Sequence, residues 1–226
     1  MITLKNLSKS YRISGIQKVV ARDISFTFPA QTTVALIGRN GAGKSSMLSM
    51  IAGLVQPDTG AISSSGRVSW PVGFQGSFHP DLNGRQNARF VARIYGLDID
   101  EMSAYVRDFA ELGDQFHLPL RNYSAGMRAR LAFAVSMAVP FDTYLIDEVT
   151  SVGDASFQAK SEAMLKHRLQ NKAAIIVSHS MAMLSRLCQS GAVLENGRIF
   201  FYQRVEKAIE HHDFLMRGQL PPWMRK

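Results

Sequence analysis

The chain has 226 residues, 46% of them apolar, which suits a single α/β domain with a hydrophobic core. Its net charge of +8 is compatible with nucleic acid, anionic lipid or a polyphosphate ligand, but no run of five Lys or Arg residues forms a basic tail. A single cysteine, Cys188, excludes an intrachain disulfide framework and fits a reducing compartment.

No segment of the sequence is expected to cross a bilayer. The first residues, MITLKNLSKSYR, lack the apolar stretch of a secretory signal. The longest apolar-looking run, 131–141, contains Pro140 and is far shorter than the roughly 20 residues of a spanning helix. Any work at a membrane is therefore expected to go through a partner.

The N-terminal part of the chain is rich in β-forming residues. Strand-like stretches occur at 2–4, 11–13 and 24–28, with turn residues at Ser14-Gly15 and Pro29 between them. They predict an antiparallel β layer. Farther on, residues 61–70 predict a short strand pair around Ser65-Gly66.

Residues 38–45 read GRNGAGKS, between an apolar run at 34–37 and apolar residues at helical spacing in 47–51. A strand, a glycine-rich loop and a helix start in this order fit G-x-x-x-x-G-K-[ST], the phosphate-binding loop. Its glycines let successive N–H groups point at an anion, and the helix adds its own N-terminal N–H groups. Lys44 is expected to reach the β- and γ-phosphates, and the Ser45 hydroxyl to bind Mg²⁺.

The middle of the chain, 83–139, has apolar residues at three- and four-residue steps and predicts a helical subdomain, with Asp98 and Asp100 as candidate caps of its second helix. The predicted organisation is one domain, 1–226. Its parts are an α/β core of 1–82 and 140–203, the helical insertion 83–139, and a C-terminal helix and tail, 204–226, irregular from Gly218. The fold class is α/β, a P-loop NTPase core with a mixed sheet, an N-terminal antiparallel β layer and an inserted α-helical subdomain.

The second half of the core shows β-α-β order. Short apolar runs at 144–146 and 174–177 are typical of buried parallel strands, and a helical stretch at 157–169 separates them. Residues 191–194 and 198–202 predict a hairpin, because Asn196-Gly197 favours a tight turn.

Four polar residues follow these strands or a similar short run. Asp147 ends an apolar strand at the edge where open α/β sheets bind ligands, and it can hold Mg²⁺ directly or through water. Glu148 can polarise a water for in-line attack on a γ-phosphate. His179 faces the same crevice and can hydrogen-bond a γ-phosphate oxygen. Gln75 can bind Mg²⁺ or the attacking water. This glutamine indicates a site only through its position relative to the other motifs.

Ser124 lies before a predicted helix, 128–138, as a natural N-cap, and the N–H groups after it make an anion site. No phosphate-binding loop is near it in sequence. The site therefore either stabilises its own helix only or serves a nucleotide bound elsewhere.

The motifs together resemble the nucleotide-binding subunit of an ABC transporter, over about residues 1–203. The matching segments, in family order, are Tyr11 as the adenine-stacking aromatic, GRNGAGKS as Walker A, Gln75 as the Q-loop, YSAGM at 123–127 as the signature, YLIDE at 144–148 as Walker B with the catalytic glutamate, Val152-Gly153-Asp154 as the D-loop and His179 as the switch histidine.

The resemblance implies a head-to-tail homodimer with two ATP molecules, in which Ser124 and Gly126 bind the γ-phosphate held by the other subunit. It implies catalytic roles for Glu148, His179 and Gln75, and Mg²⁺ binding by Ser45, Gln75 and Asp147. The residues implied in ATP binding are Tyr11, Gly38, Asn40, Gly41, Gly43, Lys44, Ser45, Ser46, Ser124, Gly126 and Asp147.

The signature departs from the common LSGGQ, since Ala125 and Met127 replace a glycine and a glutamine, but Ser124 and Gly126 remain and hydrolysis is expected to survive. Together with DEVTSVGDASF at 147–157 and the segment at 70–96, it is similar to the capsular-polysaccharide export branch of Gram-negative bacteria. O-antigen relatives often carry an extra C-terminal carbohydrate-binding domain, which this chain is too short to hold. The expected location is the cytoplasmic face of the inner membrane, with integral membrane permease subunits that meet the surface from Phe78 to Phe90 and handle the polysaccharide.

Several alternatives remain. O-antigen or teichoic-acid export is the nearest. A DNA-repair or chromosome-organising ATPase suits the basic charge but needs long coiled coils or a second half, and no sustained heptad pattern exists here. A translation-associated ATPase usually has two nucleotide domains, whereas this chain has one phosphate-binding loop. No nucleic-acid partner is therefore expected.

Overall fold

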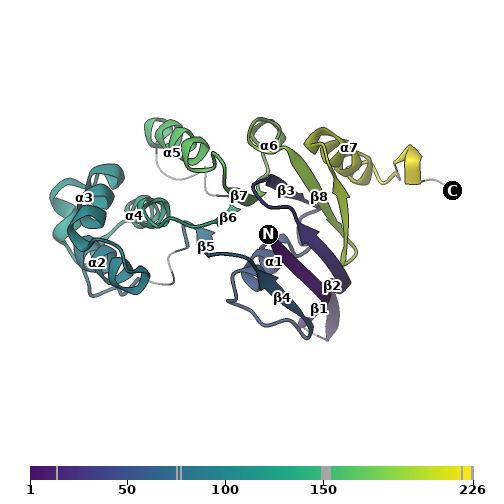
Figure 1. The fold of residues 1–226 in the computed structure, drawn as a ribbon, viewed down its shortest axis with the longest axis horizontal. Helices are drawn as coiled ribbons and strands as arrows, with labels where there is room; N and C mark the ends of the chain where they lie inside the picture. The colour runs from purple at the N-terminus through teal and green to yellow at the C-terminus, as the bar shows by residue number, and fades with distance from the viewer. Residues whose placement is uncertain (14, 75, 77, 149–153, 220, 225–226) are drawn as a thin grey trace. The chain divides into compact units, whose positions relative to one another are not determined.

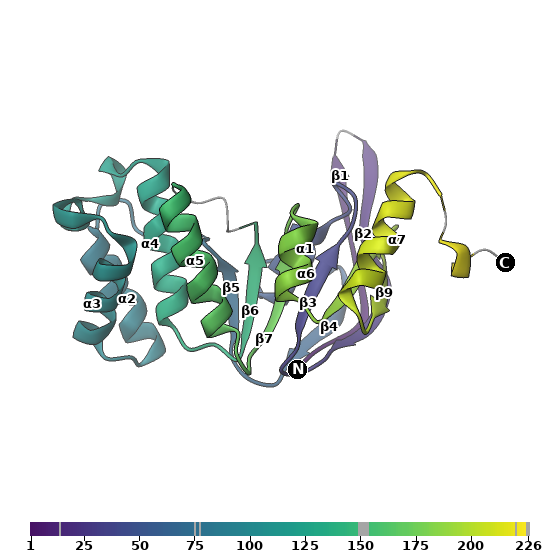
Figure 2. The same ribbon diagram turned by 90° about the horizontal axis from the view of Figure 1, so that it is seen from above.

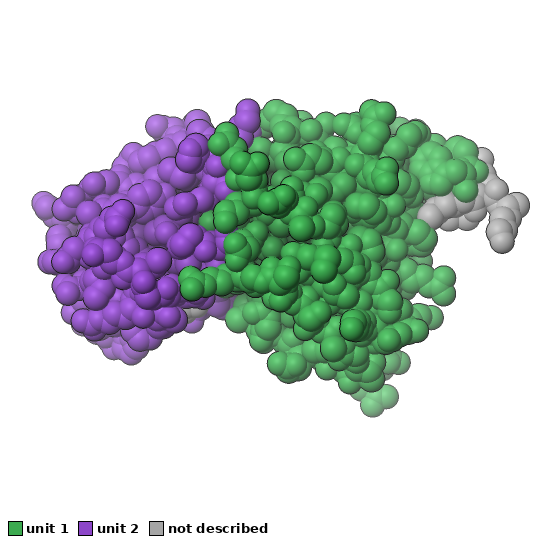
Figure 3. Space-filling view, in the orientation of Figure 1, with its two compact units in different colours: residues 1–71, 142–148, 169–226 green, residues 72–141, 149–168 purple. Residues whose placement is uncertain are grey.

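The computed structural model describes residues 1–226 except 14, 75, 77, 149–153, 220 and 225–226. The chain divides into two compact units (Figure 3). Unit 1 comprises Met1–Pro71, Asp142–Glu148 and Leu169–Lys226, and unit 2 comprises Val72–Phe141 and Val149–Arg168. Helix α5 (Ala155–Arg168), which falls within the predicted α/β core range, belongs to unit 2.

A three-stranded antiparallel sheet in unit 1 has the order β2-β1-β4. Its strands are β1 (Ile2–Ile13), β2 (Ile16–Phe28) and β4 (Thr59–Ser64). The stretches predicted at 2–4 and 11–13 belong to one long strand, which keeps pairing with β2 through register shifts between Leu4 and Ser10. The antiparallel N-terminal β layer is therefore confirmed.

The second sheet has the order β5-β6-β7-β3-β8-β9 (Figure 1). Its strands are β3 (Thr33–Ile37), β5 (Val68–Val72), β6 (Thr143–Asp147), β7 (Ala173–Val177), β8 (Ser190–Glu195) and β9 (Arg198–Tyr202). Strands β6, β7, β3 and β8 run parallel, and Figure 2 shows the first three of them side by side. Strand β9 pairs antiparallel with β8 as the predicted hairpin. The carboxyl ends of β3, β6 and β7 consequently meet at one edge, just before the candidate site residues.

The prediction that residues 61–70 form a strand pair was wrong. Both strands exist, but β4 pairs with β1, where Ile2 lies opposite Ser64, and β5 is the neighbour of β6 in the other sheet. Strand β4 is mostly exposed and forms an edge, whereas the Ser69 hydroxyl accepts a hydrogen bond from the Leu145 backbone N–H at 2.8 Å. The choice of partner was set by these distant strands rather than by the local turn.

In its described residues, unit 1 also contains the helices α1 (Lys44–Ile51), α6 (Met181–Leu187) and α7 (Val205–Met216) and the 3₁₀ turn η4 (Pro222–Met224). The buried face of α1 packs with both sheets in one apolar cluster that includes Met47, Leu48 and Leu145. The tail is less irregular than predicted, because the Trp223 indole N–H donates to the Tyr202 hydroxyl at 3.3 Å and Lys207 lies 5.3 Å from the indole ring centroid.

Unit 2 is built mainly from helices: α2 (Gly84–Tyr95), α3 (Ile99–Ala110), α4 (Ala125–Ala138), α5, and the short 3₁₀ turns η1 (Gly113–His117) and η2 (Leu120–Asn122). Asn83 and Gln86 form a capping box at the start of α2. The Asp98 cap of α3 is confirmed, and Asp100 lies in the first turn instead. No helix in the described part of the chain is long and apolar enough to cross a membrane.

Candidate functional site

The phosphate-binding loop joins β3 to α1 through two glycines with left-handed backbone, Gly41 at φ +79° and Gly43 at φ +103°. A side chain at Gly43 would be doubly unfavourable, since its Cβ would lie 2.5 Å from Val20 Cγ1. Helix α1 begins at Lys44, immediately after the loop. The free N–H groups of its first turn thus follow the loop directly, the arrangement that makes an anion site at a helix N-terminus.

The Lys44 ammonium lies within the loop that carries it. It donates hydrogen bonds to the carbonyl oxygens of Gly38 at 2.9 Å and Arg39 at 3.2 Å. Burial lowers the pKa of Lys44, and the nearby Glu148 and Asp147 carboxylates oppose that effect. The Lys44 cation therefore lies near two carboxylates from the end of β6.

The two carboxylates and the predicted histidine come from neighbouring parallel strands. Asp147 ends β6 opposite Val177 of β7, and the Glu148 backbone N–H donates to the Val177 carbonyl at 3.0 Å. His179 Nε2 lies 2.7 Å from Glu148 Oε1. Glu148 itself has φ +54°, an uncommon conformation for a residue with a side chain. The strand ends bring the predicted base and histidine into direct contact.

A pocket of about 290 Å³ opens over the loop. Most of the predicted loop and strand-end residues line it: Asn40, Gly41, Gly43, Lys44, Ser45, Ser46, Glu148 and His179. Tyr11 is half-buried on β1 and Asp147 lies at the end of β6, but neither is among the described lining residues. Lys18, which was not predicted, does line the pocket.

A neighbouring pocket of about 320 Å³ contains Gly38 and also His212 and Met216 of helix α7, which sequence reasoning missed. The His212 side chain is buried, and burial lowers its pKa, with Lys44 contributing in the same direction. No local sequence signal marks His212, because most of the chain separates it from Gly38. The packing of α7 brings it to the pocket. Lys18 had a sequence signal. It lies as far after the predicted Ser14-Gly15 turn as Tyr11 lies before it, so a hairpin there places the two residues opposite each other.

Unit 2 carries the predicted second anion site. The Ser124 hydroxyl accepts from the Met127 backbone N–H at 3.2 Å, which confirms the predicted N-cap. Ser124 and Gly126 are both exposed. Asp154 of the predicted D-loop accepts from the Phe157 backbone N–H at 2.9 Å, the main cause of its lowered pKa, and pairs with Arg130 at 2.8 Å. Gln75, Val152 and Gly153 lie outside the described residues.

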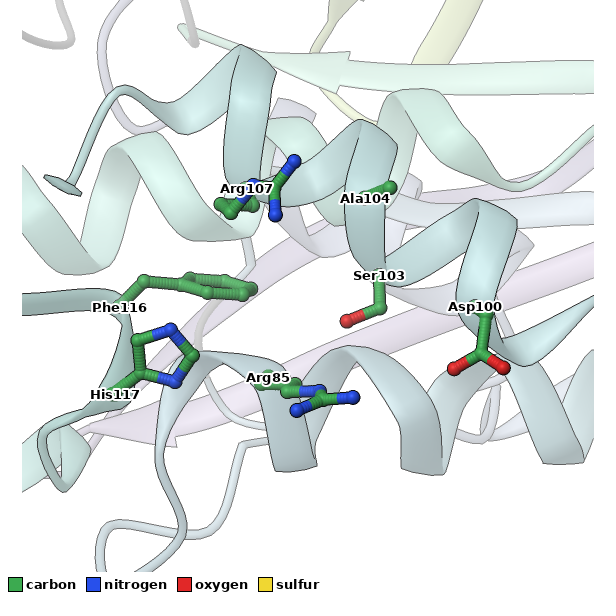
Figure 4. A pocket seen from close by; sticks show the side chains of 7 residues that line it. All are labelled: Arg85, Asp100, Ser103, Ala104, Arg107, Phe116 and His117. Carbon is green, nitrogen blue, oxygen red and sulfur yellow. The ribbon is translucent and has the colours of Figure 1, made fainter. Parts of the chain in front are cut away.

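A further pocket of about 430 Å³ in unit 2 contains none of the predicted catalytic or nucleotide-binding residues (Figure 4). Helices α2 and α3 and turn η1 supply its lining, which includes Arg85, Arg107, His117 and Asp100. The Arg107 guanidinium already pairs with Asp108 at 2.8 Å. Concave shape alone therefore does not single out the phosphate-binding loop, whereas its backbone geometry and charges do.

Comparison with known proteins identifies the family. A family model described as "ABC transporter" matches residues 21–151. The chain is 43% identical over 215 residues to the polysialic acid transport ATP-binding protein KpsT of Escherichia coli, covering 94% of this chain and 96% of KpsT. It is 41% identical to the capsule polysaccharide export ATP-binding protein CtrD of Neisseria meningitidis serogroup B, covering 95% and 100% of the two chains.

More distant relatives include the O-antigen export system ATP-binding protein RfbB of Klebsiella pneumoniae, 38% identical over 88% of this chain and 82% of RfbB. Among solved structures, the post-hydrolysis dimer of the ATP-binding cassette MJ0796 with ADP and Pi has a TM-score of 0.75 at 21% identity, covering 90% of this chain and 98% of that one. At this identity the structural similarity shows the fold alone. The family model and the relatives KpsT and CtrD establish that this chain belongs to the ABC transporter family, as one of its ATP-binding, ATP-hydrolysing subunits.

Proposed function

We propose that this chain hydrolyses ATP to power export of a capsular polysaccharide across the inner membrane, through separate membrane-spanning permease subunits. The observation that carries the proposal is the 41–43% identity to KpsT and CtrD over nearly the whole of all three chains. The O-antigen relative RfbB is less similar, at 38%. O-antigen export is the second candidate, and the exported sugar distinguishes the two.

The proposed ATP site is the pocket over the phosphate-binding loop. The loop N–H groups and Lys44 hold the phosphates, while Tyr11 stacks on the adenine. The Ser45 hydroxyl and the Asp147 carboxylate are hard oxygen donors of the kind that bind Mg²⁺, which normally completes its shell with water and phosphate oxygens. Bound there, Mg²⁺ would neutralise charge on the β- and γ-phosphates.

Glu148 is the proposed general base. As the water oxygen bonds to the γ-phosphorus, the water proton passes to the Glu148 carboxylate, and the bond from that phosphorus to the bridging oxygen of ADP breaks. The 2.7 Å contact with His179 supports this role, because it fixes one carboxylate oxygen and leaves the other for water. His179 and Gln75 are proposed to position the γ-phosphate and the attacking water.

The proposed active form is a head-to-tail homodimer. Ser124 and Gly126 are exposed at the start of α4, so a second copy can bring the γ-phosphate that it holds to these two residues. The solved ATP-binding cassette MJ0796 of the same fold is itself dimeric. The permease is proposed to meet the segment from Phe78 to Phe90 at the cytoplasmic face of the membrane, where Phe90 is 51% exposed.

Replacement of the base tests the mechanism. Glu148→Gln is expected to bind ATP but to release phosphate at least about tenfold more slowly, because the amide cannot accept the proton. Trapped ATP should then hold the dimer, measured by size-exclusion chromatography with light scattering. Glu206→Gln, the same change at an exposed position of α7, serves as the control. Normal turnover in Glu148→Gln would remove this residue from the role of base.

The aromatic role of Tyr11 and the exported substrate need separate tests. Tyr11→Ala is expected to raise KM for ATP and spare kcat, and an unchanged KM would argue against stacking on Tyr11. In cells, Lys44→Ala should block export and cause polysaccharide to accumulate inside. A capsular sugar composition supports the proposal, whereas O-antigen sugars favour the second candidate.

A further inference from the structure

Strand β2 lies along the phosphate-binding loop and presents two side chains of one face to it. Buried Val20 would be 2.5 Å, through Cγ1, from a Cβ at Gly43, and Lys18 would be 3.2 Å, through Nζ, from a Cβ at Gly41. Residues two apart in a strand project to the same face, which is why Lys18 and Val20 both face the loop. The strand thus places an apolar group against one glycine and an ammonium group against the other.

Lys18 also shares a face with the proposed adenine-stacking residue. In the antiparallel pairing of β1 and β2, Lys18 lies directly opposite Tyr11. Directly opposed residues of such a pair project to the same side of the sheet, with neighbouring side chains. A nucleotide whose base stacks on Tyr11 and whose phosphates enter the loop would therefore extend past Lys18.

The charge of Lys18 is available to a ligand. The residue is exposed, and among the described residues no ion pair joins its ammonium to a carboxylate. It lines the same pocket as Lys44 and Ser45. A triphosphate carries about four negative charges near neutral pH, of which Mg²⁺ and Lys44 together offset about three. Lys18 supplies a further positive charge on the open side of the loop.

We propose that Lys18 is a further phosphate-binding residue of the ATP site and binds the phosphate chain as a flexible point charge. The inference rests on the proposed function, because it takes the pocket over the loop to be the ATP site. It adds a second residue from the β layer, opposite Tyr11, to a site whose other residues come from the loop and the strand ends.

The test compares Lys18→Gln with the wild type in the full-length purified chain. Affinities for ATP, with Mg²⁺ present, and for adenosine are measured by displacement of a fluorescent ATP analogue. Loss of one charged contact to phosphate is expected to weaken ATP binding about tenfold and to leave adenosine binding unchanged. Lys18→Arg should restore most of the ATP affinity. Lys5→Gln, the same change at an exposed position of β1, is the control.

The ionic strength of the buffer gives a second measurement. The advantage of the wild type over Lys18→Gln should shrink as salt is added, because screening weakens a charged contact at an open site. Unchanged ATP affinity in Lys18→Gln, or equal loss of ATP and adenosine binding, would overturn the proposal. Failure of the wild type itself to bind ATP would instead count against the proposed function.

Discussion

Gly43 is the position in the candidate site where a single added methyl group should be felt most strongly. Gly43→Ala places a side chain at φ +103° and 2.5 Å from Val20 Cγ1. A left-handed backbone costs a residue with a side chain about 1–2 kcal/mol, and overpacking against a buried neighbour typically adds about 1–3 kcal/mol. We therefore expect Gly43→Ala to lower the free energy of unfolding by about 2–5 kcal/mol, and to weaken ATP binding because the loop must move.

Two further variants separate these contributions. Gly53→Ala has a similar backbone, φ +74°, but its Cβ would meet nothing within 4 Å, so it should show the backbone cost alone, about 1–2 kcal/mol. Val20→Ala removes the methyl groups that Gly43→Ala would strike. In the double variant, Gly43→Ala with Val20→Ala, the 2.5 Å contact with Val20 Cγ1 is gone and a 3.1 Å contact with its Cβ remains. The overpacking is thus partly relieved, and the two changes should couple favourably by up to about 3 kcal/mol.

The assay is urea unfolding followed by circular dichroism in the absence of nucleotide, with ATP affinity measured in parallel. The free energy of unfolding is compared between variants for which it depends equally steeply on urea concentration. The difference then reflects the folded state. Strict additivity in the double variant, or a Gly43→Ala that is no less stable than Gly53→Ala, would refute the packing argument at the loop.

Three other predictions concern different parts of the chain. Asp58 accepts hydrogen bonds from Lys9 Nζ and the Ser10 backbone N–H, which lower its pKa, so its stabilisation is complete above the unfolded pKa of 3.8 and is lost as pH falls through the folded value. The urea midpoint of Asp58→Asn should thus be lower than that of the wild type at neutral pH, and the difference should shrink in acid; a constant difference would contradict this. Asn83→Ala removes the cap of α2 and should cost about 1 kcal/mol in urea unfolding, whereas no loss would show that the capping box is dispensable. Burial raises the pKa of Cys188 to about 12, so a disulfide reagent at pH 8 should modify it only after denaturation, and fast labelling of the native chain would contradict that burial.

The site residues that could be predicted from the sequence are those whose place depends on a short segment or on the direction of a strand. GRNGAGKS needs only its own glycines and the strand and helix beside it. Asp147, Glu148 and His179 follow from the rule that parallel strands bring their carboxyl ends to one edge, and the structure places them there. The Ser124 cap was equally local. In each case the spacing within a short segment was enough.

The features that sequence reasoning missed depend on pairing between distant segments. Strands β4 and β5 flank a turn and were predicted to pair, but β1 and β6 are their partners. Lys18 reaches the loop only because β2 packs against it, and His212 only because α7 does. Such contacts depend on side-chain packing between helices and strands that are distant in the sequence. The hydrophobic pattern of one segment does not give the register of its pairing with another.

The backbone of Glu148 links chemistry to stability in this protein. At φ +54° its Cβ crowds the neighbouring backbone, at a cost of order 1 kcal/mol that surrounding contacts must offset. Glycine at this position would release that strain, but it would also remove the 2.7 Å contact with His179 and give the unfolded chain more backbone freedom. Relief of the strain and loss of the proposed base would therefore come in one substitution.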